Sequence, residues 1–213
     1  MRMRKKKNLD RRLDVCAHLL IPEPGALRGH WREALMPGAE NLLLELGCGK
    51  GRFMAAQSAD HPKNLYVALE RVPEALVMAM EKLRDREGAN VFFLREDAAL
   101  IGSFFGSGEV SGVYVNFCDP WPSNRHAKRR LTHPSFLALY REALAPGGRV
   151  EFKTDNAELF EYSADVIPRC GFKLEYITRD LHATGGDGYM TEYEARFSTQ
   201  GVKIKKLVAV RAD

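Results

Sequence analysis

A short apolar run that ends at closely spaced glycines constrains the fold of this chain more than any other feature. Residues 42–46 are apolar apart from one acid and stop at Gly47, which predicts a buried strand, and residues 52–59 have a helical pattern. Gly47, Gly49 and Gly51 lie between the two, where the missing Cβ lets the backbone pass close to a ligand. The sequence therefore predicts a strand, a ligand-binding loop and a helix.

The alternation of apolar runs and amphipathic segments continues downstream. Further strands are predicted at residues 65–69, 91–94, 113–117 and 149–153, and helices at residues 73–86 and 133–143. This order is typical of an α/β fold with a doubly wound, Rossmann-like parallel sheet. The tail is expected to be extended at residues 172–177 and 193–210, joined by the link Gly185-Gly186-Asp187-Gly188, so that an antiparallel C-terminal strand pair closes the sheet.

The first 40 residues show no clear period. We expect residues 1–40 to form a basic N-terminal arm and a short helix near Trp31, and residues 41–213 to form one domain. A chain of 213 residues with 45% hydrophobic content fits a single large core.

Composition excludes some classes of protein. Four cysteines and six histidines are scattered without the close spacing of a metal site, which predicts free thiols, a reducing compartment and no metal. No apolar segment approaches the roughly 20 residues of a membrane span, so we expect a cytoplasmic protein without membrane contact. The net charge of +4 is modest, but cations gather at residues 1–12 and 125–130, where they could meet phosphates.

Acidic residues follow three successive predicted strands. The glycines are spaced G-x-G-x-G rather than G-x-G-x-x-G, and Glu45 would repel a pyrophosphate but favour the ammonium and sulfonium of S-adenosylmethionine. Glu70 is placed to accept hydrogen bonds from ribose hydroxyls, and Asp97 lies within reach of the adenine edge. The alternative is that these acids only cap helices. Their shared place at one sheet edge favours a cofactor site.

The segment after the fourth predicted strand displays another acid. Asp119-Pro120-Trp121-Pro122 is stiffened by two prolines, and Trp121 either shields a transfer site or stacks on a base, or is a core residue held by a turn. A basic run follows directly, and it is either a solvated face or an RNA contact, of which the context favours RNA. The run comprises Arg125, His126, Lys128, Arg129 and Arg130.

Five motifs together resemble the bacterial tRNA (guanine-N7-)-methyltransferase family, over about residues 31–207. They are Glu45-Leu-Gly-Cys-Gly-Lys-Gly, Asp119-Pro-Trp-Pro, Arg125-His-Ala-Lys-Arg-Arg-Leu, Phe152-Lys-Thr-Asp155 and Thr191-Glu-Tyr-Glu194. The resemblance implies S-adenosylmethionine as cofactor, tRNA as partner, and methylation of a guanosine at N7, usually at position 46 of the variable loop.

The resemblance also implies the roles of single residues. Glu45, Glu70, Asp97 and Asp119 are expected around the cofactor, and the basic run on the RNA backbone. Asp155 and the segment from Thr191 to Glu194 are expected on the guanosine. Where the family commonly has a lysine after Asp-Pro-Trp-Pro, this chain has Ser123, so either Ser123 makes an uncharged contact or Arg125 substitutes.

Guanine N7 carries a lone pair and no proton, so its methylation needs alignment rather than a general base. Asp119 is the catalytic candidate because a carboxylate beside the purine would stabilise the positive charge it gains, and Asp155 is a second. Asp155 is alternatively part of a helix cap. Glu194 is expected to accept hydrogen bonds from the guanine N1–H and amino group, or else to be a surface charge.

Two competing functions remain. One is methylation of an exocyclic amine, although such sites commonly have Asp or Asn, Pro, Pro and an aromatic, and the order Trp121-Pro122 departs from that. The other is an RNA-binding protein that kept the fold without catalysis, against which the intact glycine loop argues. Monomer and homodimer both stay open.

Overall fold

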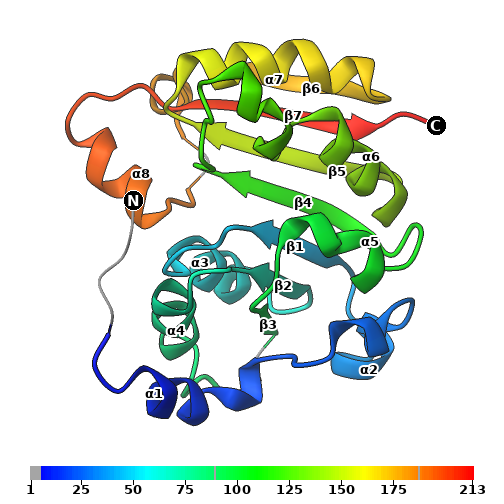
Figure 1. Ribbon diagram of the computed structural model, residues 1–213, viewed down its shortest axis with the longest axis vertical. Coiled ribbons are helices and arrows are strands. Elements are labelled where there is room, and N and C mark those ends of the chain that lie inside the picture. Colours follow the sequence, from blue (N-terminus) through cyan, green and yellow to red (C-terminus); the bar gives the residue numbers. More distant parts are fainter. Residues whose placement is uncertain (1–5, 89, 187) are drawn as a thin grey trace.

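The computed structural model describes residues 6–88, 90–186 and 188–213, and across these the chain forms a seven-stranded sheet of order β3-β2-β1-β4-β5-β7-β6 (Figure 1). Strands β1 to β5 pair in parallel, and β7 runs antiparallel to both β5 and β6. The strands are β1 (Leu42–Leu46), β2 (Leu65–Leu69), β3 (Val91–Leu94), β4 (Val110–Asn116), β5 (Leu144–Thr154), β6 (Phe172–Thr178) and β7 (Lys205–Arg211).

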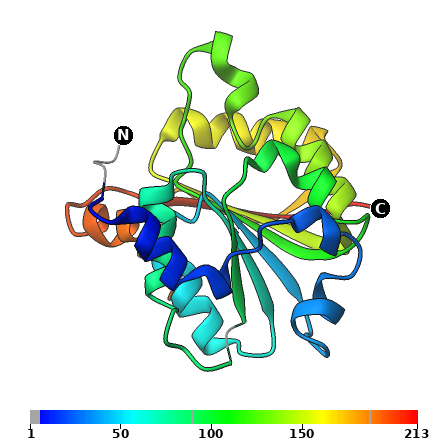
Figure 2. The same cartoon turned by 60° about the horizontal axis from the view of Figure 1, so that its bottom comes forward.

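Helices cover both faces of the sheet. The α-helices are α1 (Leu9–Val15), α2 (Trp31–Leu35), α3 (Arg52–Asp60), α4 (Pro73–Glu81), α5 (Ile101–Phe104), α6 (Pro134–Ala143), α7 (Ala157–Arg169) and α8 (Glu192–Ser198). Short 3-10 turns occupy Ala17–Leu19, Pro24–Leu27, Ala98–Leu100, Asn124–Arg129 and His182–Thr184. Helices α1, α3 and α4 lie on one side, and α5, α6 and α7 on the other (Figure 2).

The side-chain alternation of each central strand explains this double covering. In β1, Leu42 and Leu44 belong to the core beneath α6 and α7, whereas Leu43 belongs to the core beneath α3 and α4. A strand buried on both faces must be apolar almost throughout, as this one is. The predicted fold class, including the antiparallel C-terminal strands, is confirmed.

The C-terminal tail corrects one prediction. Residues 193–210 were expected to be extended, but Glu192–Ser198 is helix α8 and only Lys205–Arg211 is strand. The side chain of Thr191 accepts a hydrogen bond from the Glu194 amide at 3.0 Å, which caps the helix, and the rings of Tyr193 and Phe197 pack one turn apart at 4.2 Å. Local capping and i,i+4 packing therefore outweigh the extended pattern.

The long helix predicted at residues 73–86 is shorter in the structure, where α4 ends at Glu81 and turns continue. Strand β5 is longer than predicted, because it begins at Leu144 and includes the Pro146-Gly147-Gly148 segment.

Residues 6–40 pack against the rest of the domain rather than extending away from it. Helix α1 lies in the segment expected as an arm, and Arg12 donates two hydrogen bonds to Glu81 on α4, at 2.7 and 2.6 Å. Trp31, at the start of α2, is fully buried and its indole N–H donates to the Phe104 carbonyl at 2.8 Å. Residues 1–5 of the basic arm and Asp187 of the predicted link lie outside the described residues, and the boundary at residue 40 stays a prediction.

None of the helices in the described part of the chain is long and apolar enough to cross a membrane.

Candidate active site

The carboxyl ends of β1 to β4 open on a cleft of about 660 Å³. One predicted residue after each strand lines it, namely Gly47 after β1, Glu70 after β2, Asp97 after β3 and Asp119 after β4. Ligands bind at this edge in open α/β sheets, because the loops that connect strands to helices leave a crevice there. The structure therefore brings four of the predicted cofactor residues into one cavity.

The glycine loop after β1 has a backbone conformation that residues with a Cβ rarely adopt. Gly47, Gly49 and Gly51 have φ angles of +78°, +57° and +77°, in the left-handed region that favours glycine. A Cβ on Gly51 would lie 2.6 Å from that of Ala79, so this glycine also lets α3 approach α4 closely. The Gly49 amide donates to Glu70 at 3.0 Å, which ties the loop to the end of β2.

Glu70 and Asp97 both hold backbone and both face the cleft. The other carboxylate oxygen of Glu70 accepts from the Val72 amide at 2.8 Å, and burial raises the pKa of Glu70. Asp97 accepts from the Ala99 amide at 2.9 Å, so the capping alternative describes its contact correctly, and that hydrogen bond holds the pKa of Asp97 low. A cap at the cleft wall leaves room for the cofactor role as well.

Sequence reasoning missed Arg71 beside these acids. Its guanidinium pairs with Asp97 at 2.6 Å, and the residue lines the cleft. The signal was its position, because it follows the strand-end acid Glu70 directly.

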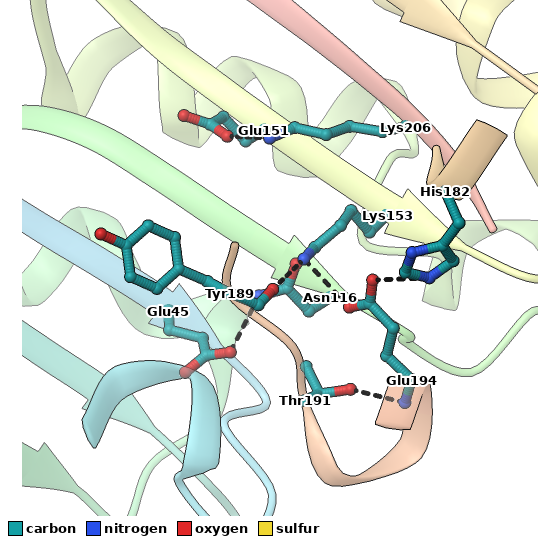
Figure 3. A network of polar contacts seen from close by, with 9 residues as sticks. All are labelled: Glu45, Asn116, Glu151, Lys153, His182, Tyr189, Thr191, Glu194 and Lys206. Carbon is teal, nitrogen blue, oxygen red and sulfur yellow. Dashed lines mark hydrogen bonds and ion pairs between the residues drawn. The ribbon is translucent and has the colours of Figure 1, made fainter. Parts of the chain in front are cut away.

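Glu45 lies behind the glycine loop rather than on the cleft wall. Its side chain is 1% exposed, and one oxygen accepts from the Asn116 amide nitrogen at 2.9 Å (Figure 3). The other oxygen, Oε2, has no hydrogen-bond partner within the described part of the chain, and burial raises the pKa of this carboxyl to about 7. An orphaned buried carboxylate oxygen next to the loop fits a cationic group such as the ammonium of S-adenosylmethionine.

The Asp119 segment has a strained backbone and lines the same cleft. Phe117 and Trp121 have positive φ angles of +52° and +44°, which bulky residues rarely adopt and which concentrate at functional loops. Asp119 is exposed at the cleft. Trp121 lines the cleft and carries the Arg129 guanidinium 4.8 Å above its ring, so it is a wall residue and not a core tryptophan.

The cations of the basic run occupy two different environments. Arg130 is 8% exposed, donates to the Trp121 carbonyl at 3.0 and 3.2 Å, and stacks 4.4 Å from the Tyr162 ring. Arg125, Lys128 and Arg129 are exposed, and His126 packs edge-on against Trp121 at 5.9 Å. The geometry therefore makes Arg130 a brace for the loop and leaves the other cations facing solvent.

The predicted guanosine residues gather where α8 docks beyond the carboxyl ends of β4 and β5 (Figure 1). Asp155 accepts from the Tyr193 hydroxyl at 3.0 Å, and Thr191 caps α8. The Tyr193 ring packs 5.1 Å from that of Phe117, a cleft residue, so this cluster borders the cleft. Ser123 lies apart, exposed at the start of the Asn124–Arg129 turn.

Two alternatives for these residues are wrong. Asp155 does not cap helix α7. The cap is Asn156, whose side chain accepts a hydrogen bond from the Leu159 amide at 2.7 Å. Glu194 is not a surface charge, because its side chain is fully buried and its carboxylate lies 3.0 Å from the Lys153 ammonium. A guanosine contact by Glu194 therefore requires access through the α8 segment.

Sequence reasoning assigned no role to Asn116 and Lys153. Asn116 bonds to Glu45 and Lys153 bonds to Glu194, so the two residues lie between the glycine loop and α8 (Figure 3). They are register partners at the ends of β4 and β5. The available signal was a polar residue at the end of an apolar run that is buried on both faces.

In the ranges 6–88, 90–186 and 188–213, no group of three or more His, Cys, Asp or Glu residues could hold a metal ion.

The sheet order, the reversed β7, and the glycine loop with acids at successive strand ends define the class of Rossmann-like methyltransferases. Solved structures agree at the level of fold. The 16S rRNA methyltransferase KamB has a TM-score of 0.66 at 16% identity, covering 85% of this chain and 92% of that one. A mutant 16S rRNA (adenine(1408)-N(1))-methyltransferase from Catenulisporales acidiphilia, with cosubstrate SAM, has a TM-score of 0.57 at 15% identity, covering 98% and 93%.

Sequence comparison is more specific. A family model described as "Putative methyltransferase" matches residues 39–207. The tRNA (guanine-N(7)-)-methyltransferase of Clostridium perfringens (strain SM101 / Type A) is 42% identical, covering 98% of this chain and 99% of that protein. The protein of the same name from Geobacillus kaustophilus (strain HTA426) is also 42% identical, covering 99% and 97%. The chain belongs to the tRNA (guanine-N7-)-methyltransferase family, which confirms the resemblance.

Proposed function

We propose that this protein transfers the methyl group of S-adenosylmethionine to N7 of a guanosine in tRNA, forming 7-methylguanosine. The observation that carries the proposal is the cleft itself, where acids at successive strand ends meet an exposed basic turn. The names of the 42% identical relatives support the same acceptor. We further propose position 46 of the variable loop as the site, and the cytoplasm, where tRNA is found, as the place of reaction.

Each predicted cofactor residue binds a different part of S-adenosylmethionine. The buried Glu45 carboxylate receives the ammonium group, and Gly47, Gly49 and Gly51 let the backbone pass close to the methionyl part. Glu70 accepts from the ribose hydroxyls and Asp97 from the adenine edge. The bound cofactor supplies an electrophilic methyl group.

The protein contributes alignment and charge stabilisation. The N7 lone pair attacks the methyl carbon as the bond to sulfur breaks, so no proton is removed and no general base is required. Positive charge then develops on the purine. Asp119 would stabilise that charge, and its exposure at the cleft beside the strained Trp121 segment supports this role.

The remaining predicted residues bind tRNA. Arg125, Lys128 and Arg129 are the exposed cations that meet phosphates, His126 shapes the same turn, and Arg130 acts by holding the turn in place. Asp155, Thr191 and Glu194 surround the guanosine, and Ser123 makes an uncharged contact where the family commonly has a lysine.

The test is direct product identification. Unmodified tRNA is incubated with the protein and labelled S-adenosylmethionine, digested, and the labelled nucleoside identified. We expect 7-methylguanosine from the normal transcript and none from a matched transcript with adenosine at position 46. Label in another nucleoside, or no label, refutes the reaction, and label in 7-methylguanosine from both transcripts refutes only the position.

A further inference from the structure

We propose that Lys153 is a positioning residue that holds the segment 188–198 against the end of β5, so that its substrate-binding groups face the guanosine. The inference rests on the proposed function for the identity of the substrate, but the anchoring itself is a property of this fold.

The contacts of Lys153 are buried and directed at two points of that segment. Its ammonium donates to the Tyr189 carbonyl at 2.7 Å and to a Glu194 carboxylate oxygen at 3.0 Å (Figure 3). The exposed fractions of the two charged side chains are 2% and 0%. Leaving a carboxylate this deeply buried without its charged partner is strongly destabilising, so the ion pair with the ammonium ties α8 to β5.

A second side chain lies near the Glu194 carboxylate. His182 Nε2 is 3.4 Å from its other oxygen, and this contact is an ion pair only when the imidazole is protonated. The hydrogen bond from Lys153 is therefore the contact that orients the carboxylate at the end of β5. Because the Glu194 side chain is fully buried, its pairing fixes the position of α8 rather than presenting the carboxylate to a base.

The other polar contacts of the segment lie nearer the surface. Tyr193 donates to Asp155, and Glu192 pairs with Lys82 at 3.0 Å with about a third of each side chain exposed. Ion pairs with this exposure contribute little to stability, because water screens the attraction. The contact of the Tyr189 hydroxyl with His61 Nε2, at 3.2 Å, is exposed as well. Among the described residues, the Lys153 contacts are therefore the buried polar contacts that hold the segment to β5.

The position of Lys153 also predicts which function its removal should leave intact, namely cofactor binding. Its register partner Asn116 donates to Glu45 beneath the glycine loop, so Lys153 stands between that loop and α8. Glu70 and Asp97 do not depend on α8 for their hydrogen bonds. Lys153 does act on Glu45, because its charge lowers the pKa of that carboxyl, so cofactor binding is compared at pH 8.5, above the Glu45 pKa. At that pH, removing Lys153 should impair tRNA use far more than cofactor binding.

Lys206 provides a matched control. It faces Lys153 across the β5–β7 pair, is similarly buried, and forms its ion pair with Glu151 at 2.8 Å (Figure 3). Among the described residues, the carboxylate that pairs with Lys206 is Glu151 within β5, whereas the carboxylate that pairs with Lys153 is Glu194 on α8.

The experiment compares Lys153→Met with Lys206→Met in the whole protein. For Lys153→Met at pH 8.5 we expect kcat/KM for tRNA to fall at least tenfold, the S-adenosylmethionine Kd measured without tRNA to stay within threefold, and amide hydrogen exchange to accelerate across residues 188–201. For Lys206→Met we expect both constants within twofold and unchanged exchange in that segment. If Lys153→Met fails to bind cofactor, Lys153→Gln is judged by the same criteria.

The inference is overturned if both lysine variants lose tRNA activity equally, if exchange at residues 188–201 is unchanged in Lys153→Met, or if both Lys153 variants lose cofactor binding. These outcomes are distinct from failure of the proposed function. If the unaltered protein makes no 7-methylguanosine, the proposed function fails while the exchange measurement still tests the anchor.

Discussion

At the scale of single residues, environment assigns different tasks to acids that look alike in the sequence. Glu45 is buried with an orphaned oxygen, Asp97 is partly exposed and paired with Arg71, and Asp119 is exposed at the cleft. Burial penalises ionisation, whereas hydrogen bonds to backbone amides favour it. A carboxylate therefore has an unpaired buried oxygen in one place and a fixed hydrogen-bonded position in another.

The raised pKa of Glu45 predicts pH-dependent cofactor binding. With a pKa of about 7, this carboxyl is protonated in the free protein at pH 6 and must lose its proton to receive an ammonium. We expect S-adenosylmethionine affinity measured by equilibrium titration to fall as the pH drops from 8 to 6, approaching tenfold per unit below the pKa. Glu45→Gln should bind weakly at pH 8 and lose this dependence; equal slopes for the two proteins would contradict the assignment.

Asp119 is the test of charge stabilisation. Because its side chain is exposed, Asp119→Ala should leave the thermal unfolding midpoint nearly unchanged. Losing one group that stabilises developing charge typically costs about 100-fold in rate, so we expect single-turnover methylation at saturating cofactor to slow by about that factor. A rate equal to that of the unaltered protein would remove Asp119 from catalysis.

At the scale of elements, two glycines of one loop have separable roles. Gly51→Ala places a Cβ 2.6 Å from Ala79, so we expect a lower midpoint of chemical unfolding as α3 is pushed from α4. Gly49→Ala meets no atom within 4 Å, and it should cost only the backbone strain, about 1 kcal/mol, while weakening cofactor binding. Denaturant titration and cofactor titration on both variants separate the effects, and the reverse pattern would refute them.

The basic turn makes a prediction about salt. Arg125 and Lys128 are exposed, and each phosphate contact contributes roughly −0.7 to −0.9 to the log–log slope of affinity against salt. Replacing both by alanine should flatten the slope for tRNA by about 1.5. Arg130→Ala serves as the contrast, because it removes a buried brace and should lower the unfolding midpoint. An unchanged slope in the double variant would exclude the turn from the interface.

At the scale of the whole molecule, the N-terminal segment belongs to the same core as the sheet. Trp31 stacks 4.9 Å from Phe105, and its indole N–H is bonded to the Phe104 carbonyl. Cutting a buried tryptophan back to alanine typically costs about 3–5 kcal/mol. We expect Trp31→Ala to lower the free energy of unfolding, measured in urea, by about that amount; a loss below about 1 kcal/mol would mean that the segment is dispensable.

Features carried by neighbouring residues were predictable from the sequence. Strands β1, β2 and β3 begin and end where the apolar runs do, and the glycine loop is found from spacing alone. These features can be predicted locally, because a pattern over a few neighbouring residues indicates a buried strand or a left-handed turn. Helix α8 was missed because its cap and its stacked rings compete with a pattern that reads as extended.

The sequence by itself determined the fold class, the family and the position of the glycine loop. Only the tertiary structure decided which charges are buried and paired. Arg125 and Arg130 cannot be told apart within the basic run of the sequence. In the structure Arg125 faces solvent, whereas Arg130 is buried and donates a hydrogen bond to the Trp121 carbonyl. Lys153 and Glu194 are 41 positions apart and become a pair only when α8 docks on β5. Burial and pairing depend on contacts between distant segments, and no local pattern encodes them.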